Sequence, residues 1–339
     1  MHRLFALFLI MIGSTAYGSD SGAPVKLGVI GLTHTHVHWV FESESRENFE
    51  IVGIVESNRN LARRYSKQHG FDMALVYESM EEMLAAVEPE GVTAFGSIYD
   101  HLAVVETMAP RGIHVMVEKP LAVSLAHAGA MKALAEEHGI HLLTNYETTW
   151  YPSVHKARDV ILDSAIGPIR KVIVRDGHMG PVRLGINQEF LDWLLDPELN
   201  GAGALFDFGC YGVNLMTWLM DGEKPLSVTA ITQQLQPENH PHVDDEATIV
   251  LTYPNAQAVI QASWNWPIGR KDMEVYGLNG AVFADDRHHL RIRMAEGYDG
   301  FEEESLRLSE RPAPWHDPFA MFSAVIRGTI ELPPNDLSS

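Results

Sequence analysis

The chain has 339 residues, 46% of them hydrophobic and 21% charged, which is typical of a globular protein of about two domains. Its formal net charge of −20 argues against nucleic acid or an anionic membrane surface as a partner, because both attract clustered lysine and arginine. Cys210 is the only cysteine, so no disulfide can form within the chain. Small molecules remain as the expected ligands.

Residues 1–18 have the pattern of a secretory signal peptide. A basic start ending at Arg3 precedes an apolar stretch, residues 4–12, and the small residues Ala16 and Gly18 stand at the cleavage position. The apolar stretch is too short to span a bilayer; a buried N-terminal strand or a membrane anchor is the alternative. The signal predicts a secreted, periplasmic protein that has no membrane attachment after cleavage.

Residues 25–150 alternate short apolar runs with helix-like stretches. Ser124 is expected to cap the helix after Pro120, with Leu125 and Met131 on its buried face. The alternation predicts a doubly wound parallel sheet. Its expected strands, which are buried on both faces, cover residues 25–30, 50–56, 91–97, 114–118 and 141–146.

Residues 151–339 have a different rhythm, in which β-rich segments are joined by short turns. Pro254 and Asn255 form a hairpin signal, and one helix is expected from about Ala204 to Met220. We therefore predict an α/β protein, with a parallel N-terminal sheet followed by an α+β domain that holds a large, open, mostly antiparallel sheet.

The stretch from Gly31 to His36 stands where a dinucleotide-binding turn is expected, directly after the first strand. Gly31 takes the first place of G-x-G-x-x-G, but Thr33 and His36 replace the second and third glycines. Amide groups at a helix N-terminus bind pyrophosphate without particular side chains, and Thr33 and a neighbouring histidine such as His34 add donors. A dinucleotide is therefore still expected at this loop.

A metal site is the alternative use of this loop. His34 and His38 are four residues apart, the spacing of metal-binding histidines on a helix. No acidic or cysteine ligand accompanies them in the local sequence, so no metal is predicted.

Three further stretches keep a characteristic order along the chain. Glu118-Lys119-Pro120 stands at the end of the strand expected at residues 114–118, D-x-G-x-Y-x-x-N begins at Asp207, and VDDEATIVLTYP begins at position 243. In this order they resemble the Gfo/Idh/MocA family of nicotinamide-dependent sugar oxidoreductases, in its glucose-fructose oxidoreductase branch. The resemblance implies a Rossmann domain and an open-sheet substrate domain. Family members continue into a final helix, so this sequence is expected to be truncated or to close its fold otherwise.

The resemblance places Lys119 and Asp207 in the active site and Tyr211 where many members have histidine. Oxidation of a secondary alcohol requires a hydride acceptor, a base and a positive charge near the developing alkoxide. Lys119 would supply this charge and lower the pKa of Tyr211, so that tyrosinate is the expected base. From the residues alone, the alternative is that Asp207 forms a cap or salt bridge and Tyr211 packs in the core.

Glu56 closes the second strand, where an acidic side chain accepts hydrogen bonds from the adenosine ribose and repels a 2′-phosphate. NAD is therefore predicted over NADP, although the nearby Arg59 weakens this preference. The resemblance adds His101, Glu118 and Lys119 to the expected cofactor contacts.

The substrate site is expected to be neutral and partly aromatic. Asn145, Trp150 and Tyr151 are predicted to line it, because aromatic rings stack on sugars, and Asn214 and Arg270 are further candidates. Two tryptophans, at positions 264 and 266, alternate on one strand, which is more typical of core or interface packing.

The sequence thus predicts an exported NAD(H)-dependent oxidoreductase that acts on a sugar or glycoside hydroxyl. Because an exported enzyme lacks a pool of free NAD, a tightly held cofactor that is recycled within each catalytic cycle is one expectation. An exposed open sheet favours a homo-oligomer. The alternative is a carbohydrate-binding protein that has lost the cofactor but kept the scaffold.

Overall fold

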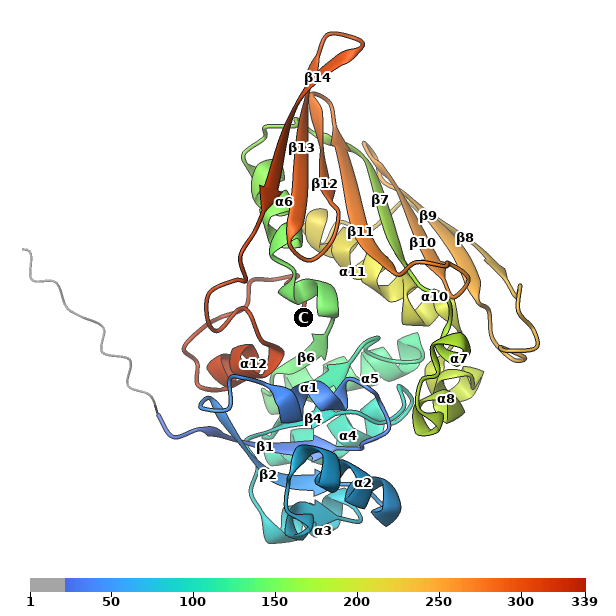
Figure 1. Cartoon of the computed structure of the whole chain (residues 1–339). Helices are drawn as coiled ribbons and strands as arrows, with labels where there is room; N and C mark the ends of the chain where they lie inside the picture. The colour runs from blue at the N-terminus through green and yellow to red at the C-terminus, as the bar shows by residue number, and fades with distance from the viewer. Residues whose placement is uncertain (1–21) are drawn as a thin grey trace, which may run out of the picture.

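The computed structural model describes residues 22–339, so the signal peptide predicted at residues 1–18 lies outside the described part of the chain. The two predicted domains lie one above the other in Figure 1, with the N-terminal sheet below and the large sheet above. Within residues 22–339, no helix is both long enough and apolar enough to cross a membrane.

The first sheet is parallel throughout and has the order β3-β2-β1-β4-β5-β6. The strand order reverses between β1 and β4, and the carboxyl ends of these strands form the usual binding position of a doubly wound sheet. The predicted fold class is confirmed. The strands are β1 (Val25–Ile30), β2 (Phe49–Val55), β3 (Val76–Tyr77), β4 (Gly91–Ala94), β5 (His114–Glu118) and β6 (Leu142–Asn145).

The helices of this domain pack on its sheet. Ser124 caps α5 by accepting from the His127 amide, and Met131 is buried, both as predicted. Leu125 is instead exposed, because it faces an open groove beside α5 and not the sheet. The helices are α1 (Val37–Glu42), α2 (Arg59–His69), α3 (Met80–Ala86), α4 (His101–Met108) and α5 (Leu125–His138), with short 3₁₀ turns at Met73–Leu75, Ala109–Arg111 and Glu147–Trp150.

The second sheet has the order β14-β13-β12-β11-β7-β10-β9-β8, and its pairs are antiparallel except for β7 with β10. The hairpin predicted at Pro254 and Asn255 is present, closed by the Tyr253 amide donating to the Ala256 carbonyl. The strands are β7 (Ile169–Gly177), β8 (Ser227–Gln233), β9 (Glu246–Thr252), β10 (Gln257–Ser263), β11 (Arg270–Gly277), β12 (Gly280–Ala284), β13 (His289–Glu296) and β14 (Gly300–Arg307).

One face of this sheet is covered by α6 (Pro152–Leu162) and α11 (Gly209–Leu219). The helix predicted from about Ala204 to Met220 is two helices, because the Asp207 carbonyl accepts from a lysine side chain and the Tyr211 amide bonds to Phe208 instead. The other helices of this region are α7 (Pro181–Leu184), α8 (Gln188–Leu194), α9 (Pro197–Asn200) and α10 (Ala204–Asp207).

Helix α12 (Pro318–Ile326) corrects the predicted domain division. The sequence assigned it to the second domain, but it packs beside the first sheet (Figure 1). Phe319 and Phe322 are fully buried in the same apolar core as Val25 and Leu27. The chain therefore returns to its first domain after the large sheet is complete.

Candidate active site

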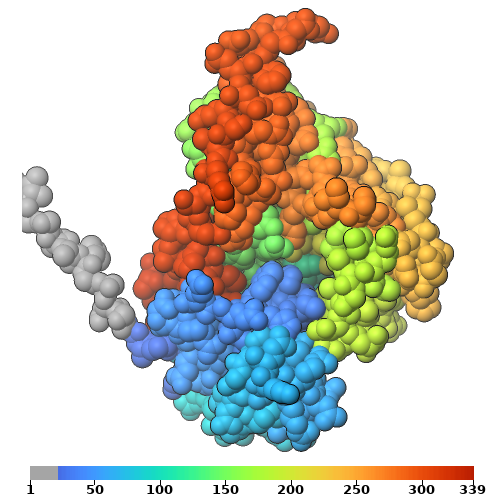
Figure 2. Space-filling view, in the orientation of Figure 1, coloured from blue at the N-terminus to red at the C-terminus, as the bar shows by residue number. Residues whose placement is uncertain are grey.

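Lys119 and Asp207 come from different domains and meet in the buried contact between them. Figure 2 shows the surface hollowed between the blue N-terminal domain and the orange strands. Lys119 follows β5, and its Nζ donates both to the Asp207 carboxylate and, at 2.9 Å, to the Asp207 carbonyl oxygen. Burial opposes charge on both groups, but each charge stabilises the other, so the pKa of Lys119 is raised and that of Asp207 is lowered. The site therefore contains a buried ion pair.

A tryptophan holds the second oxygen of the same carboxylate. Trp264, which is fully buried, donates from Nε1 to Asp207 Oδ2 at 3.0 Å. The sequence favoured packing for this residue, since alternation of two tryptophans on a strand does not reveal a polar partner. With Lys119 on one oxygen and Trp264 on the other, the orientation of Asp207 is fixed.

Tyr211 does not behave as predicted. It is buried, and burial raises its pKa well above the ordinary value, with Glu147 and Asp176 adding to the rise. The prediction that Lys119 lowers this pKa is wrong, because the ammonium of Lys119 is bonded to Asp207 and lies 5.3 Å from the centre of the Tyr211 ring. Tyr211 lies in the site as a neutral phenol.

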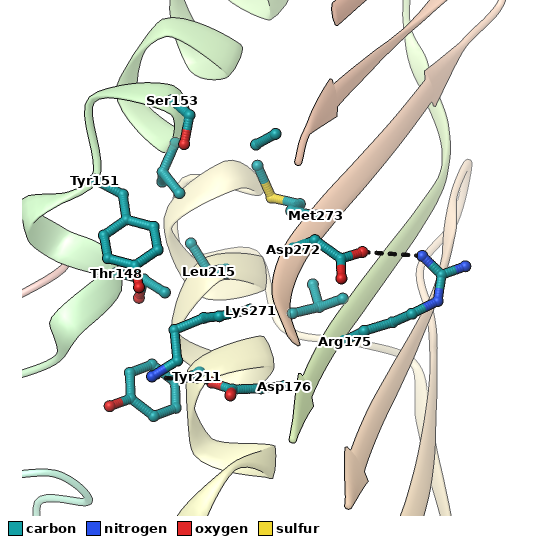
Figure 3. A pocket seen from close by; sticks show the side chains of 13 residues that line it. Thr148, Tyr151, Ser153, Arg175, Asp176, Tyr211, Leu215, Lys271, Asp272 and Met273 are labelled. Atoms are coloured by element: carbon teal, nitrogen blue, oxygen red, sulfur yellow. Dashed lines mark hydrogen bonds and ion pairs between the residues drawn. The ribbon is translucent and has the colours of Figure 1, made fainter. Parts of the chain in front are cut away.

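A second lysine, which the sequence analysis did not single out, lies closer to Tyr211. The Nζ of Lys271 is 4.1 Å from the centre of the Tyr211 ring (Figure 3). It donates to Glu147 Oε2 at 2.6 Å and lies 3.6 Å from Asp176 Oδ2. Tyr151 donates to the other oxygen of Glu147 at 2.6 Å. One cation thus contacts two carboxyl groups, that of buried Asp176 and that of partly exposed Glu147.

His178 borders the same region. Its Nδ1 accepts from the Gly180 amide at 3.0 Å, and its ring meets Phe208 edge to face. Burial lowers its pKa, so the ring is neutral and carries its proton on Nε2. His178 can donate a hydrogen bond but has no free nitrogen to act as a base.

An open pocket lies next to these groups and contains two of the predicted substrate residues, Tyr151 and Arg270. Asn214 lines a different groove and donates to the Leu337 carbonyl. The open pocket holds four basic and five acidic side chains, so it offers hydrogen bonds without a strong net charge. Its charged lining consists of Arg270, Lys271, Arg287, Arg291, Asp176, Asp272, Glu274, Asp285 and Asp286.

Asn145 and Trp150 are not at the pocket, contrary to prediction. They form a buried chain in which His36 Nδ1 lies 2.8 Å from Glu118, Asn145 donates to Glu118 at 2.7 Å, and Trp150 donates to Asn145 at 3.0 Å. Both are buried, because their polar groups are satisfied inside the first domain. Their role here is to fix Glu118, next to Lys119.

A separate pocket lies at the carboxyl ends of β1, β2 and β4, where the strand order reverses. Gly31 has φ of +80°, and a Cβ there would lie 2.9 Å from the Gly96 nitrogen, so only glycine fits. His101 also lines the pocket; its Nδ1 contacts the Leu121 carbonyl and its buried Nε2 has no partner among the described residues. Burial lowers the pKa of His101 to about 4, so it is neutral.

Glu56 lies in this pocket at the end of β2, as predicted. One of its oxygens accepts from the Leu32 amide at 3.1 Å and the other from the Asn58 amide at 2.7 Å. Arg59 donates to the Val76 carbonyl and is not part of the lining, so it does not offset the acidic side chains there. These acidic residues are Glu56, Glu78, Glu81 and Asp100.

The loop before α1 differs from the expected phosphate-binding turn. The amides of Leu32, His34 and His36 already donate to Glu56, to the Phe95 carbonyl and to His34 Nδ1, respectively. The Thr33 hydroxyl, expected to reach a phosphate, donates to Phe95 at 3.4 Å. The loop also does not lead directly into a helix as expected. Helix α1 has only six residues and begins at Val37, after the loop.

The histidines of the loop contribute to two different clusters. His34 and His36 lie near Glu118, while His38 lies near Glu42 and His69. The fold brings Glu118 to His34 and His36, whereas Glu42, four residues after His38, is a local acidic neighbour that the sequence analysis overlooked. The nitrogens that face one another are used within the protein: His34 Nδ1 accepts from the His36 amide, and His38 Nδ1 lies 2.7 Å from His69 Nε2.

The first domain is doubly wound and has a pocket of the dinucleotide-binding type. A buried lysine–aspartate pair joins it to an open-sheet domain. This combination defines a class of oxidoreductase. The chain belongs to the Gfo/Idh/MocA family of these enzymes. Residues 25–146 match the family model described as the oxidoreductase family, NAD-binding Rossmann fold, and residues 154–283 match the GFO/IDH/MocA C-terminal domain.

Curated relatives are distant. The chain is 25% identical over 293 residues to D-xylose 1-dehydrogenase [NADP(+)] of Haloarcula marismortui, covering 84% of this chain and 76% of that protein. It is 26% identical to trans-1,2-dihydrobenzene-1,2-diol dehydrogenase of Bos taurus, covering 62% of this chain and only 58% of the relative. These matches show an oxidoreductase family that uses pyridine nucleotides.

Solved structures show the same fold. An inositol dehydrogenase homologue from Azotobacter vinelandii, complexed with NAD+, superposes with a TM-score of 0.79 at 20% identity and covers 93% of this chain and 91% of that one. An aldose-aldose oxidoreductase from Caulobacter crescentus, complexed with glycerol, gives 0.75 at 21% identity and covers 92% of both chains.

Proposed function

We propose that the protein is an NAD(H)-dependent oxidoreductase that acts on a secondary hydroxyl of a sugar or glycoside. The observation that carries this proposal is the buried Lys119–Asp207 pair, which joins the two domains and whose carboxylate is held by Trp264. The names of the relatives, which include a xylose dehydrogenase and an inositol dehydrogenase homologue, support a polyhydroxyl substrate.

The pocket at the strand ends fits a dinucleotide. Gly31 leaves room for close approach, and the unpartnered Nε2 of His101 offers a buried polar contact. Glu56 follows β2, where the adenosine ribose is expected, in a lining that holds three further acidic side chains; these charges would disfavour a 2′-phosphate and support NAD over NADP. When bound, the cofactor would supply the hydride acceptor.

The groups of the chain itself would act on the reacting oxygen. The Lys119 ammonium, fixed by Asp207 in a buried site, stabilises negative charge that develops there. His178 offers a neutral donor, and the balanced charges of the open pocket suit a neutral sugar better than a phosphorylated one.

The proposal also includes export and assembly. The signal at residues 1–18 supports a periplasmic location, and a location without free NAD supports a tightly held, internally recycled cofactor. The homo-oligomer remains a prediction. Mass spectrometry of the supernatant of denatured protein would reveal a cofactor that copurifies.

The test is dinucleotide binding followed by turnover. NAD+ and NADP+ are titrated into the purified protein by calorimetry, and reduction at 340 nm is followed with D-xylose, D-glucose and myo-inositol. We expect NAD+ to bind more tightly than NADP+, and Lys119→Met to retain binding but lose about 10²–10³ in rate. Binding of neither dinucleotide would reject the proposal.

One observation favours a second function, a carbohydrate-binding protein without cofactor. Three loop amides that would otherwise meet a pyrophosphate already donate to protein acceptors: those of Leu32, His34 and His36. Sugar binding by calorimetry, with no heat from either dinucleotide, would support this alternative.

A further inference from the structure

The proton-transfer residue of the proposed reaction is not evident from the family motif. Tyr211 is a neutral phenol of raised pKa, Asp207 is held at both oxygens, and Nδ1 of His178 already accepts a hydrogen bond. Asp207 and His178 would each have to give up an existing hydrogen bond before accepting a proton, and Tyr211 would first have to ionise. Another carboxyl group in the open pocket has an oxygen that makes no hydrogen bond to the described residues.

Asp176 is that group. It lies near the carboxyl end of β7, is 2% exposed, and has an oxygen, Oδ2, without a hydrogen-bond partner among the described residues. It lines the open pocket together with His178, Phe208 and Lys271, and it also borders the small cavity beside Tyr211. Figure 3 shows its carboxyl group next to the Tyr211 ring.

Around Asp176 there are fewer lysines than carboxyl groups, so Asp176 has no cation of its own. Lys271 from β11 is 3.6 Å from Asp176 Oδ2, but its nearer carboxylate, at 2.6 Å, is Glu147. On the side of α10, Lys119 is neutralised by Asp207. Two cations, Lys119 and Lys271, therefore face three carboxyl groups. Those of Asp176 and Asp207 are buried and that of Glu147 is partly exposed, and the set is neutral only if one of the three keeps a proton.

We propose that Asp176 is the proton-exchanging residue of the site: its carboxyl group holds a proton at neutral pH and exchanges that proton with the reacting oxygen of the substrate. This inference rests on the proposed function. Burial raises the pKa of Asp176 to about 8, with Glu147 adding to the rise and Lys271 opposing it, whereas Lys271 outweighs burial at Glu147 and lowers its pKa to about 2. The extra proton therefore belongs to Asp176.

The step balances in both directions. In oxidation, the hydroxyl O–H bond breaks and its proton passes to the Asp176 carboxylate as the carbonyl forms; a bound nicotinamide would accept the hydride of the adjacent C–H bond. In reduction, protonated Asp176 returns the proton to the carbonyl oxygen. Oxidation should therefore accelerate as pH rises through about 8, and reduction should slow over the same range.

The first experiment follows the carboxyl group itself. The full-length protein is labelled with ¹³C at aspartate Cγ, and the Asp176 signal is assigned by its loss in Asp176→Asn. We expect titration near pH 8, moved upward in Lys271→Met and downward in Glu147→Gln, because these changes remove a cation and an anion, respectively. Titration below pH 5 would overturn the proposal.

The second experiment measures kcat and KM against pH in both directions with NAD(H) and D-xylose or its oxidation product. Asp176→Asn should lower kcat by about 10²–10⁴ with KM changed only a few-fold, and should abolish the pH dependence near 8. Asp163→Asn, at an exposed residue after α6, is the control. A wild-type pH profile in Asp176→Asn would reject the catalytic role.

Dinucleotide binding, measured on the same samples, distinguishes failure of the proposed function from failure of the role of Asp176. If the wild type binds no dinucleotide, the proposed function fails and the catalytic role of Asp176 fails with it. If dinucleotide binds and D-xylose turns over but Asp176→Asn is unaffected, only the role of Asp176 is wrong.

Discussion

At the scale of single residues, the buried Lys119–Asp207 pair links the two domains and invites a double-variant test. Removing one partner leaves an uncompensated buried charge, so Lys119→Met or Asp207→Asn alone should each cost about 3–5 kcal/mol of stability. The double variant should recover part of this loss but none of the activity. Urea unfolding and turnover measure the two effects; a double variant with additive destabilisation would show that the two groups do not interact.

Trp264 offers a test of positioning. Trp264→Phe removes the donor to Asp207 Oδ2 and leaves that oxygen unsatisfied in a buried site, which should cost about 1–3 kcal/mol. Activity should fall as well, because the carboxylate is free to turn. Trp266→Phe, two residues further along the same segment after β10, is the matched control, and equal effects of both changes on unfolding and rate would assign only packing to Trp264.

Glu56 accepts a hydrogen bond from the Leu32 amide in the loop after β1 and also lines the pocket at the strand ends. Glu56→Gln keeps the size but removes the charge, so NAD+ affinity should fall and the preference over NADP+ should narrow by about tenfold. Glu81→Gln, in the same pocket but outside the contacts of Glu56, should change the ratio less. Calorimetry with both dinucleotides provides the comparison; an unchanged ratio in Glu56→Gln would show that Glu56 does not select the cofactor.

The residues that sequence reasoning found and those it missed differ in a physical way. Lys119 and Asp207 stand in compact local motifs, so their positions could be predicted. Asp176, Glu147 and Lys271 lie on separate elements and in unremarkable sequence, and only the fold brings them together. The pKa of Tyr211 depends on all the charges around it, which no local motif records.

At the scale of elements, the buried parallel strands were predictable because they are short apolar runs, and the Pro254 hairpin because its turn residues are diagnostic. The loop after β1 was identified as atypical, but its hydrogen bonds were not predictable. They go to Glu56 and Phe95, which are far away in sequence. The break between α10 and α11 likewise depends on Lys119, which reaches across from the other domain.

Helix α12 depends on a cap that can be removed. Asp317 accepts from the Phe319 and Ala320 amides and also from the Ser43 hydroxyl, so it ties the helix start to the segment after α1. Asp317→Ala should cost about 1–2 kcal/mol in urea unfolding. Asp299→Ala, in the exposed turn before β14, should change stability by less than about 0.5 kcal/mol. Equal stability of the Asp317 variant and the wild type would show that the cap is dispensable.

At the scale of the whole molecule, Asp176 should make stability depend on pH. Its pKa is raised in the folded state, to about 8 from an unfolded value near ~3.9, so its contribution is fully present below ~4 and is lost as pH rises through about 8. Stability of the wild type relative to Asp176→Asn should therefore fall by up to about 1.4 kcal/mol per pH unit in this window. Urea unfolding at pH 5, 6, 7 and 8 measures the slope.

Glu147 acts in the opposite sense at lower pH. Its pKa is lowered to about 2, so its contribution is present above the unfolded value near ~4.3 and is lost as pH falls toward 2. Asp176 and Glu147 therefore affect stability in different pH ranges.

A difference in unfolding free energy between wild type and Asp176→Asn that stays constant from pH 5 to 8 would mean that Asp176 is ionised over this whole range.

Because α12 packs on the first domain, that domain cannot finish folding until the end of the chain has been synthesised. Its apolar side chains cover the core around Val25 and Leu27, yet the ribosome makes them after the entire second sheet. At about 5–20 residues per second, the N-terminal domain waits tens of seconds for its last helix. A nascent chain released before Phe319 leaves that core open to solvent and to other chains.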